Sequence, residues 1–205
     1  MDLKLIYGNM RALCEAPQMM LHYADIPYEY KMVWDHYGSS WAEVKKDIIF
    51  NRLPILIINE DKYIWQSNTI IRYLSNLTKT KPSDEFQLAY CDAVFESTHE
   101  MFSPLNPTIN MTFGEKYNSN KKKLLEDILP NSLNNFEKLL QNSSGNFFIG
   151  NDPFYCDFNA YHHFSMCLIL DKNIFSNFPN LKKFINNFEK LNNIKKYLDS
   201  RPELV

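Results

Sequence analysis

The chain has 205 residues, 45% of them apolar, and a formal net charge of -2 at neutral pH. This length allows one large domain or two small ones, and this apolar content argues against disorder. The charges are spread along the chain, which excludes a nucleic-acid-binding arm or a basic membrane-binding face as its main feature.

Targeting and redox signals are weak in this sequence. No apolar run reaches the roughly 18 residues of a membrane-spanning helix. The first residues, MDLKLIYGN, lack the apolar core of a signal peptide, so we expect a cytosolic protein. The cysteines have an irregular spacing that matches neither a zinc pattern nor a CxxC pair, and we expect them to be reduced and mostly buried. They are Cys14, Cys91, Cys156 and Cys167.

The first part of the chain predicts alternating strands and helices. Apolar residues at every second position indicate strands, and helically spaced ones indicate helices, in the order β-α-β-α-β-β-α. We expect the strands at 3–7, 28–34, 54–59 and 63–65, and the helices at 14–26, 41–48 and 67–77.

The pattern changes near residue 78. A polar, proline-containing segment without periodicity follows, and after it only helical patterns remain. We expect these helices at about 84–113, 119–141, 157–170, 180–188 and 191–199. Mixed α/β sequence followed by all-α sequence indicates two domains. We therefore assign 1–78 to the first domain, 79–86 to a linker and 87–205 to a helical second domain.

Four blocks of sequence resemble a known family. They are LIYGNMRALCEAPQMML, NRLPILIINEDKYIWQSNTIIRYL, FFIGNDPFYCDFNAYHHF and FPNLKKFINNFEKLNNIKKYL, and their order is that of the cytosolic glutathione S-transferases. The resemblance covers essentially the whole chain. It implies an α/β thioredoxin-like domain followed by an all-α bundle. The spacing of Trp41 and Lys45 and the Gln66-Ser67-Asn68 triplet resemble the mu and sigma classes best.

The resemblance implies an enzyme that transfers the thiolate of its co-substrate, glutathione, to small apolar electrophiles in detoxification. The catalytic residues would be Tyr7 and Arg11. Tyr7 ends the first strand, where the family's tyrosine hydroxyl donates to the thiolate and so stabilises it. Otherwise, a tyrosine at a strand end fills the core and keeps its hydroxyl solvated.

Several positions would hold glutathione. The resemblance implies a cis bond before Pro54, so that the backbone of Leu53 pairs with the cysteinyl part; the alternative is an ordinary edge-strand proline. Gln66 and Ser67 would bind the γ-glutamyl end, because the free N–H groups and dipole of a helix N-terminus suit a carboxylate. Alternatively, or in addition, Ser67 caps its helix.

The remaining glutathione contacts would be charged or aromatic. Trp41 and Lys45, four residues apart on one helix face, would reach the glycyl carboxylate, with help from Arg52. Glu100 lies where sigma-like enzymes place an acid that reaches across a dimer interface. A twofold homodimer is therefore expected.

The electrophile pocket would be apolar. Its candidate residues are Gly8, Leu13, Phe102, Leu105, Met166 and Leu204. At Gly8 the family usually has an aromatic residue, and glycine opens space there.

The chain departs from the family pattern at two further points. Ala12-Leu13 stands where the family has Gly-Arg, and loss of this second arginine argues against prostaglandin D synthase-like isomerisation and weakens thiolate activation. Phe154 replaces the Ser or Thr that usually caps the helix near Asp157, which alters a folding feature.

No metal is expected, nor a nucleic-acid or membrane partner. Asp92, Glu96 and His99 share a helix face, but an imidazole suits magnesium or calcium poorly. Two rival functions stay open. One is a non-catalytic or weakly catalytic binder of glutathione or hydrophobic ligands, or a structural protein, on the same scaffold. The other is a thiol enzyme that uses Cys14, although Cys14 lies past the position where thiol-using relatives place their cysteine.

Overall fold

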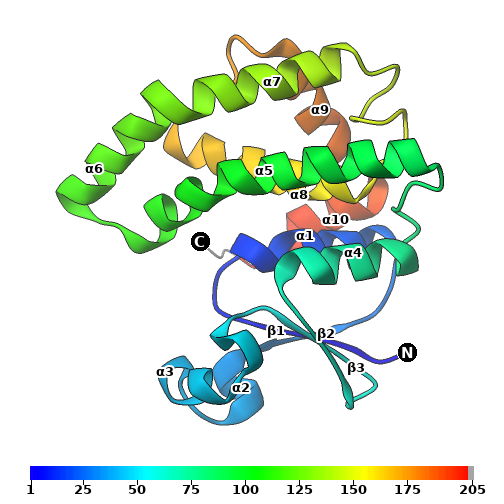
Figure 1. The fold of residues 1–205 in the computed structure, drawn as a ribbon, viewed down its shortest axis with the longest axis vertical. Helices are drawn as coiled ribbons and strands as arrows, with labels where there is room; N and C mark the ends of the chain where they lie inside the picture. Colours follow the sequence, from blue (N-terminus) through cyan, green and yellow to red (C-terminus); the bar gives the residue numbers. More distant parts are fainter. Residues whose placement is uncertain (203–205) are drawn as a thin grey trace. The chain divides into compact units, whose positions relative to one another are not determined.

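The computed structural model of the protein describes residues 1–202, which form two compact units (Figure 1). The first unit consists of Met1–Thr80 together with the last helix, from Asn192 onward, and the second of Lys81–Leu191. No helix within these described residues is long and apolar enough to cross a membrane.

A four-stranded sheet forms the centre of the first unit. Its strands are β1 (Leu3–Tyr7), β2 (Glu29–Met32), β3 (Ile55–Ile58) and β4 (Lys62–Trp65), in the spatial order β2-β1-β3-β4. β1 runs parallel to β2 and antiparallel to β3, and β3 runs antiparallel to β4. The four strands follow one another along the chain in the predicted order. The predicted strand 28–34 ends early, because Val33 turns inward and begins a short helix.

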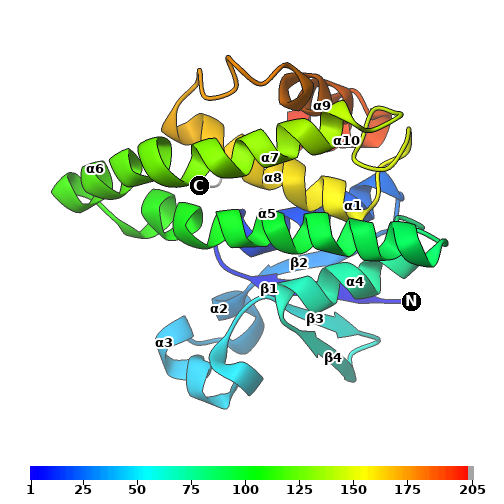
Figure 2. The same ribbon diagram turned by 45° about the horizontal axis from the view of Figure 1, so that its top comes forward.

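Helices cover both faces of this sheet (Figure 2). The helices of the unit are α1 (Glu15–Tyr23), α2 (Val33–Tyr37), α3 (Trp41–Val44), α4 (Ser67–Leu77) and α10 (Asn192–Ser200), with 3-10 turns at Ala12–Cys14, Lys45–Asp47 and Ile49–Asn51. α1 and α4 lie on one face, and α2 and α3 on the other. Because side chains alternate along a strand, Ile55 and Ile57 share a core cluster with Ile6 and Val33.

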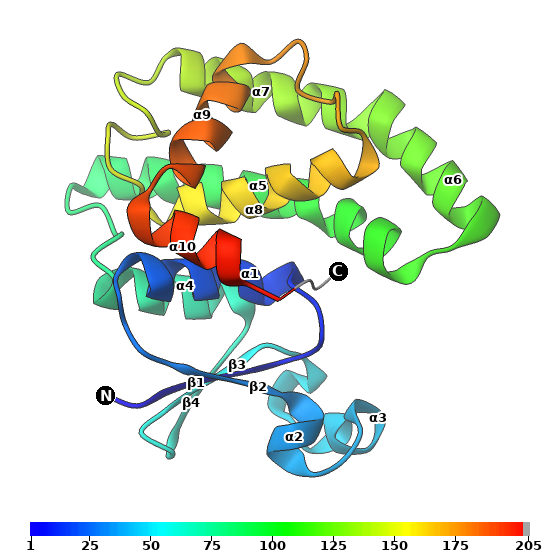
Figure 3. The ribbon, with the colours of Figure 1, turned by 180° about the vertical axis from the view of Figure 1, so that it is seen from behind.

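The last helix belongs to the first unit, whereas the sequence led us to expect it in the helical domain. α10 lies beside α1 (Figure 3). Its apolar stripe buries Ile194 and Tyr197, and the Tyr197 hydroxyl donates a 3.1 Å hydrogen bond to the buried Glu15 carboxylate. Arg201 forms an ion pair with the same carboxylate. Burying a carboxylate is costly unless it is paired and hydrogen-bonded. The contacts of Tyr197 and Arg201 with Glu15 therefore hold α10 and the residue after it against α1.

The second unit is entirely helical. Its helices are α5 (Glu85–Met111), α6 (Gly114–Lys123), a π-helical turn (Leu124–Ile128), α7 (Leu129–Gln141), α8 (Tyr155–Leu170) and α9 (Pro179–Glu189). α8 is buried along nearly its whole length, and α5 packs along it. Aromatic rings fill the core around α8, with Phe164 and Phe188 both contacting Phe184.

Candidate active site

Tyr7 is the last residue of β1, and its side chain is 6% exposed. The Leu13 N–H donates a 3.2 Å hydrogen bond to the Tyr7 hydroxyl oxygen. Burial raises the pKa of Tyr7, so the hydroxyl stays protonated at neutral pH. No acceptor for its own hydrogen lies within hydrogen-bond distance among residues 1–202. The hydroxyl is therefore a donor with an unused hydrogen.

The loop after β1 contains two of the predicted departures. Ala12 has a φ of 28°, a left-handed conformation that glycine adopts at lower cost. Gly8 is surrounded by open space, since a Cβ there would meet nothing within 4 Å. The Gly8 carbonyl accepts a 2.8 Å hydrogen bond from the Tyr30 hydroxyl. Open space therefore adjoins Gly8, and the hydrogen bond from Tyr30 connects the loop to β2.

The Arg11 guanidinium turns toward the end of the chain. Its Nη2 donates to the Pro202 carbonyl at 3.3 Å. Its Nε is buried and has no acceptor within the described part of the chain. Within residues 1–202, the Arg11 side chain therefore hydrogen-bonds to the C-terminal segment and makes no hydrogen bond to Tyr7.

The Leu53–Pro54 peptide bond is cis, which confirms that prediction. Pro54 comes directly before β3, and the pairing of β3 starts at Ile55, so Leu53 lies outside the described ladder. Leu53 is half-buried against the same apolar cluster as Trp41. Arg52, which precedes it, has an extended backbone and an exposed side chain.

The polar triplet lies at the N-terminus of α4. Gln66 is the N-cap residue, and its φ of 69° and ψ of 119° are rare for a residue with a side chain. Ser67 is the first helical residue and is buried; it is not the capping residue, which corrects the simple capping alternative. The Oδ1 of Asn68 is buried without a partner in the described part of the protein. Strained backbone of this kind concentrates at ligand sites.

Trp41 begins α3, which a capping box stabilises. The Ser40 N–H donates to the Glu43 carboxylate at 2.9 Å, and the Ser40 hydroxyl donates to it at 2.8 Å. The predicted helix 41–48 divides after Val44, and the exposed Lys45 opens a 3-10 turn. Trp41 packs against the core cluster, which fixes its indole, whereas the Lys45 side chain is exposed.

The predicted residues of the second unit differ in exposure. Glu100 is exposed on α5. Phe102, Leu105 and Met166 are buried, and the Phe102 ring stacks on the His163 ring with centroids 4.3 Å apart. Their place in an electrophile pocket stays a prediction. Leu204, the last predicted pocket residue, lies outside the described residues.

The cysteines offer no reactive thiolate. Cys14, Cys91, Cys156 and Cys167 are all buried and form no disulfide. Burial raises the pKa of Cys14 well above its usual value. A thiol enzyme needs an accessible thiolate, and the environment of Cys14 works against one. No group of three potential metal-binding side chains occurs within residues 1–202.

Asp157 holds the backbone of two residues, whereas the sequence connected it only with the altered helix cap at Phe154. Its carboxylate is buried in α8 and accepts the Phe148 N–H at 3.1 Å and the Phe154 N–H at 2.8 Å. Burial raises the pKa of Asp157 to about 7, against the effect of these two donors. An acid three residues after a helix N-cap is the signal that could have found it.

Comparisons with known proteins agree with this architecture. Residues 1–76 match the model of "Glutathione S-transferase, N-terminal domain" and residues 99–201 that of "Glutathione S-transferase, C-terminal domain". The chain is 29% identical to "Glutathione S-transferase P" of Caenorhabditis elegans over 98% of this chain and 94% of that protein. It is 30% identical to "Glutathione S-transferase Mu 3" of Homo sapiens, over 95% of this chain and 86% of that protein.

Solved structures give the same result. The pi-class glutathione S-transferase of Onchocerca volvulus superimposes with a TM-score of 0.85 at 26% identity, covering 98% of this chain and 94% of that chain. The structure "rat hPGDS complexed with a quinoline" gives a TM-score of 0.87 at 25% identity, covering 99% and 98%.

A thioredoxin-like unit followed by a helical unit defines the glutathione S-transferase fold. The chain belongs to the glutathione S-transferase family. Its relatives divide between the pi class and the mu class at similar identities, so the class within the family is not fixed.

Proposed function

We propose that the protein conjugates glutathione to small apolar electrophiles, with the Tyr7 hydroxyl stabilising the thiolate. The observation that carries this proposal is the state of that hydroxyl. It accepts the Leu13 N–H, its own hydrogen is unused, and burial raises the pKa of Tyr7, so it remains a donor. A group in this state cannot take the thiol proton at neutral pH, but it stabilises the anion once the proton has left.

The energy required is within reach of one such donor. A free thiol has a pKa of about 8.5, and lowering it by about two units requires roughly 2.7 kcal/mol of preferential stabilisation of the anion. A hydrogen bond to a charged group contributes about 1.5–3 kcal/mol. The proton passes to solvent, the sulfur forms a bond to the electrophilic carbon, and the leaving group departs with the bonding electrons.

The glutathione clamp is proposed on two backbone features. Leu53, before the cis bond, has backbone groups outside the ladder, which suits pairing with the cysteinyl part. The N-terminus of α4 offers free N–H groups and the Ser67 hydroxyl to the γ-glutamyl carboxylate. The unpartnered Asn68 Oδ1 suits the γ-glutamyl ammonium, because that group has three hydrogens to donate.

Trp41, Lys45 and Arg52 complete the clamp in this proposal. Trp41 is held by the core and offers one directed N–H, whereas the exposed Lys45 and Arg52 offer charge to the glycyl carboxylate. These residues and the Gln66-Ser67 pair are also the basis for proposing a mu/sigma-like class. A cytosolic location is part of the same proposal.

A twofold homodimer is supported by an exposed apolar patch on the first unit. Ile49, Phe50 and Tyr63 are all exposed, with Phe50 at 61%, and the rings of Phe50 and Tyr63 both lie against Trp65. Apolar side chains gathered in this way mark interaction surfaces. We expect Phe50→Glu to convert a dimer to monomers in sedimentation velocity. A monomeric wild-type protein would contradict the dimer, and with it the role of Glu100 across the interface.

The test of the proposed function is conjugation of a chlorodinitrobenzene-type electrophile beside retention on glutathione resin. Wild type should turn over and be retained. Ser67→Ala should raise the KM for glutathione about tenfold with kcat little changed, because it removes one hydrogen bond to a bound carboxylate. An unchanged KM would remove Ser67 from the clamp.

One observation favours a second candidate function. Leu13 replaces the family's second arginine, and Arg11 contacts the chain end instead of Tyr7. A protein that binds glutathione or hydrophobic ligands with little turnover is therefore the alternative. Retention without turnover would support that alternative, and failure of both would support a structural role.

A further inference from the structure

A short 3-10 turn, Ala12–Cys14, holds the hydroxyl oxygen of Tyr7. The Leu13 N–H, in the middle of this turn, donates to that oxygen at 3.2 Å. A hydrogen bond to its oxygen restricts the directions in which the Tyr7 hydroxyl points its own, unused hydrogen. The position of the turn therefore sets the direction of the donor on which the proposed function depends.

This turn has little stability of its own. It spans three residues, and a 3-10 turn has poorer hydrogen-bond geometry than an α-helix. Ala12 has a left-handed backbone with a φ of 28°, which is costly for a residue with a side chain. No side-chain hydrogen bond caps the start of the turn within residues 1–202. The turn consequently depends on contacts with other parts of the first unit.

The end of the chain supplies contacts on both sides of the turn. On the N-terminal side, Arg11 Nη2 donates to the Pro202 carbonyl at 3.3 Å. On the C-terminal side, Glu15 forms an ion pair with Arg201. All four residues line one pocket of about 400 Å³ in the first unit. Because Arg201 and Pro202 are consecutive, one short segment, here called the C-terminal anchor, holds the residues that flank the turn.

Arg201 provides the stronger contact of the C-terminal anchor. The Glu15 side chain is 2% exposed and that of Arg201 is 17% exposed. Removing one partner of a buried ion pair is far more costly than removing one partner of an exposed pair. The Arg11 bond to Pro202, at 3.3 Å, is longer than the usual range for an N–H donor and an oxygen acceptor. The anchor therefore depends mainly on the Arg201 guanidinium.

From these contacts we propose that Arg201 is a positioning residue for Tyr7. It holds the start of α1 through Glu15 and brings the Pro202 carbonyl to Arg11, and together these contacts keep the Leu13 N–H on the Tyr7 hydroxyl. Arg201 acts through the turn, without touching the reacting atoms. The inference rests on the proposed function, because the direction of the Tyr7 hydroxyl affects the reaction only if that hydroxyl stabilises the thiolate.

The test is a titration of the bound glutathione thiol in the full-length protein, followed by the absorbance of the thiolate. Arg201→Gln should raise the thiol pKa by about one unit, half of the shift assigned to Tyr7, because the hydroxyl remains but is no longer held. The thiolate fraction at pH 7 then falls about threefold. Arg201→Lys keeps a cation for Glu15 and should restore most of the wild-type value. An unchanged thiol pKa in Arg201→Gln would overturn the inference.

An unpaired carboxylate at Glu15 is costly enough to threaten folding of Arg201→Gln. The double variant Glu15→Gln/Arg201→Met leaves no buried charge and still removes the ion pair. It should show the same rise in thiol pKa, and an unchanged value in this folded variant would overturn the inference as well.

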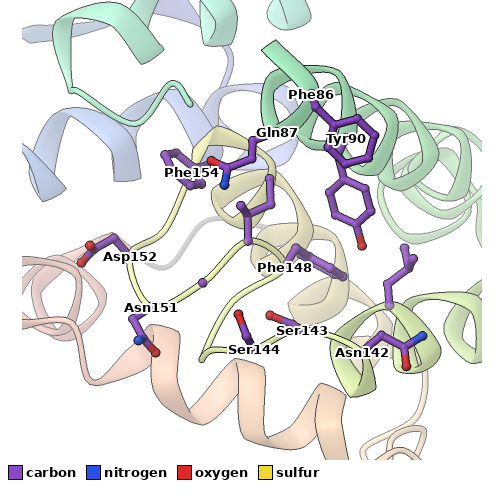
Figure 4. A pocket seen from close by; sticks show the side chains of 13 residues that line it. Phe86, Gln87, Tyr90, Asn142, Ser143, Ser144, Phe148, Asn151, Asp152 and Phe154 are labelled. Carbon is purple, nitrogen blue, oxygen red and sulfur yellow. The ribbon is translucent and has the colours of Figure 1, made fainter. Parts of the chain in front are cut away.

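Two control variants separate positioning from a general loss of stability. Tyr197→Phe removes a 3.1 Å hydrogen bond to the same Glu15 carboxylate but leaves Arg201 in place, so it should lower the melting temperature without moving the thiol pKa. Asn151→Ala changes an exposed residue of the 580 Å³ pocket in the second unit (Figure 4), whose lining includes no residue of the C-terminal anchor. It should match wild type. A shift in either control as large as that in Arg201→Gln would overturn the inference.

A combination with Tyr7→Phe tests whether Arg201 acts through Tyr7. Arg201→Gln leaves the negative charge of Glu15 uncompensated, and a negative charge raises the pKa of a nearby thiol directly. The double variant Tyr7→Phe/Arg201→Gln should titrate like Tyr7→Phe alone, because the group that Arg201 positions is already gone. A further rise in the double variant would mean that the charge acts directly, and would overturn the positioning role.

Amide hydrogen exchange at Leu13 gives a readout that needs no glutathione. Arg201→Gln should speed this exchange about tenfold, because the turn opens more often, and Tyr197→Phe should leave it like wild type. If Tyr7→Phe does not move the thiol pKa, the proposed function fails, and faster exchange in Arg201→Gln would still support the hold of the C-terminal anchor on the turn. Unchanged exchange at Leu13 would overturn the anchor, whatever the fate of the proposed function.

Discussion

Replacing Tyr7 by phenylalanine removes one hydroxyl from a side chain that is 6% exposed, with little change in volume. The apolar packing at the end of β1 is kept. The Leu13 N–H loses its acceptor, which costs about 1 kcal/mol of unfolding free energy. The thiolate loses its donor, which is the change that tests the mechanism.

The magnitude follows from the pKa of the bound thiol. If Tyr7 lowers this pKa from about 8.5 to about 6.5, the thiolate fraction at pH 7 falls about 25-fold in Tyr7→Phe. The rate falls less than this, because the more basic thiolate of the variant is about sixfold to tenfold more nucleophilic. The position of the pKa in the rate profile, more than the size of the rate loss, is therefore the decisive readout.

The assay is kcat/KM for a chlorodinitrobenzene-type electrophile measured across the pH range, at saturating glutathione. Tyr7→Phe should move the apparent pKa up by about two units, with little change in glutathione affinity. Tyr30→Phe is the matched control, since it also removes a hydroxyl that bonds the β1 loop, at the Gly8 carbonyl. Its profile should match wild type. Identical profiles for wild type and Tyr7→Phe would refute the role of Tyr7.

Three other predictions follow from the structure. Ala12→Gly combined with Leu13→Arg should lower the apparent thiol pKa by about one further unit, because the arginine adds a positive charge near the thiolate and the glycine accommodates the φ of 28° at position 12; the same rate profile measures it. Cys14→Ala should keep turnover within about twofold of wild type, and wild-type turnover should be insensitive to alkylation, because the Cys14 thiol is buried and its pKa is raised. Burial lowers the pKa of His163 well below its usual value, so the unfolded chain takes up a proton below pH ~6.5 while the folded chain does not. Wild type should then lose up to about 1.4 kcal/mol of unfolding free energy per pH unit below that point, and denaturant titration should find a shallower loss in His163→Asn.

Each of these predictions has an opposing result. A profile unmoved by the loop substitutions would mean that the missing arginine does not limit thiolate formation. Loss of turnover on replacing Cys14 in a folded protein would restore the thiol-enzyme alternative. Equal pH slopes for wild type and His163→Asn would mean that the imidazole takes up a proton in the folded state.

The sequence predicted elements well where local chemistry and packing agree. α4 was expected at 67–77 and spans Ser67–Leu77, since the polar triplet marks its start and its buried stripe is strongly periodic. The cis bond before Pro54 came from family resemblance, because sequence alone favours trans. The β1 position of Tyr7 followed from both the apolar run and the resemblance.

Other features depend on partners that are distant in sequence. The pattern of the last helix predicts a helix but not its place beside α1, which the buried Glu15 and its partners Tyr197 and Arg201 determine. The π-helical turn at Leu124–Ile128 adds a residue to one turn, and an apolar pattern with helical spacing does not reveal it. The left-handed backbone at Gln66 was equally invisible, because glutamine does not predict it.

The most direct test of the central claim is a spectroscopic titration of glutathione bound to the wild-type protein. Ultraviolet absorbance of the thiolate reports its fraction at each pH without any turnover. The account predicts that the bound thiol titrates about two units below the free value of ~8.5, and that Tyr7→Phe returns it to that value. A bound thiol that titrates like free glutathione in the wild type would contradict the account.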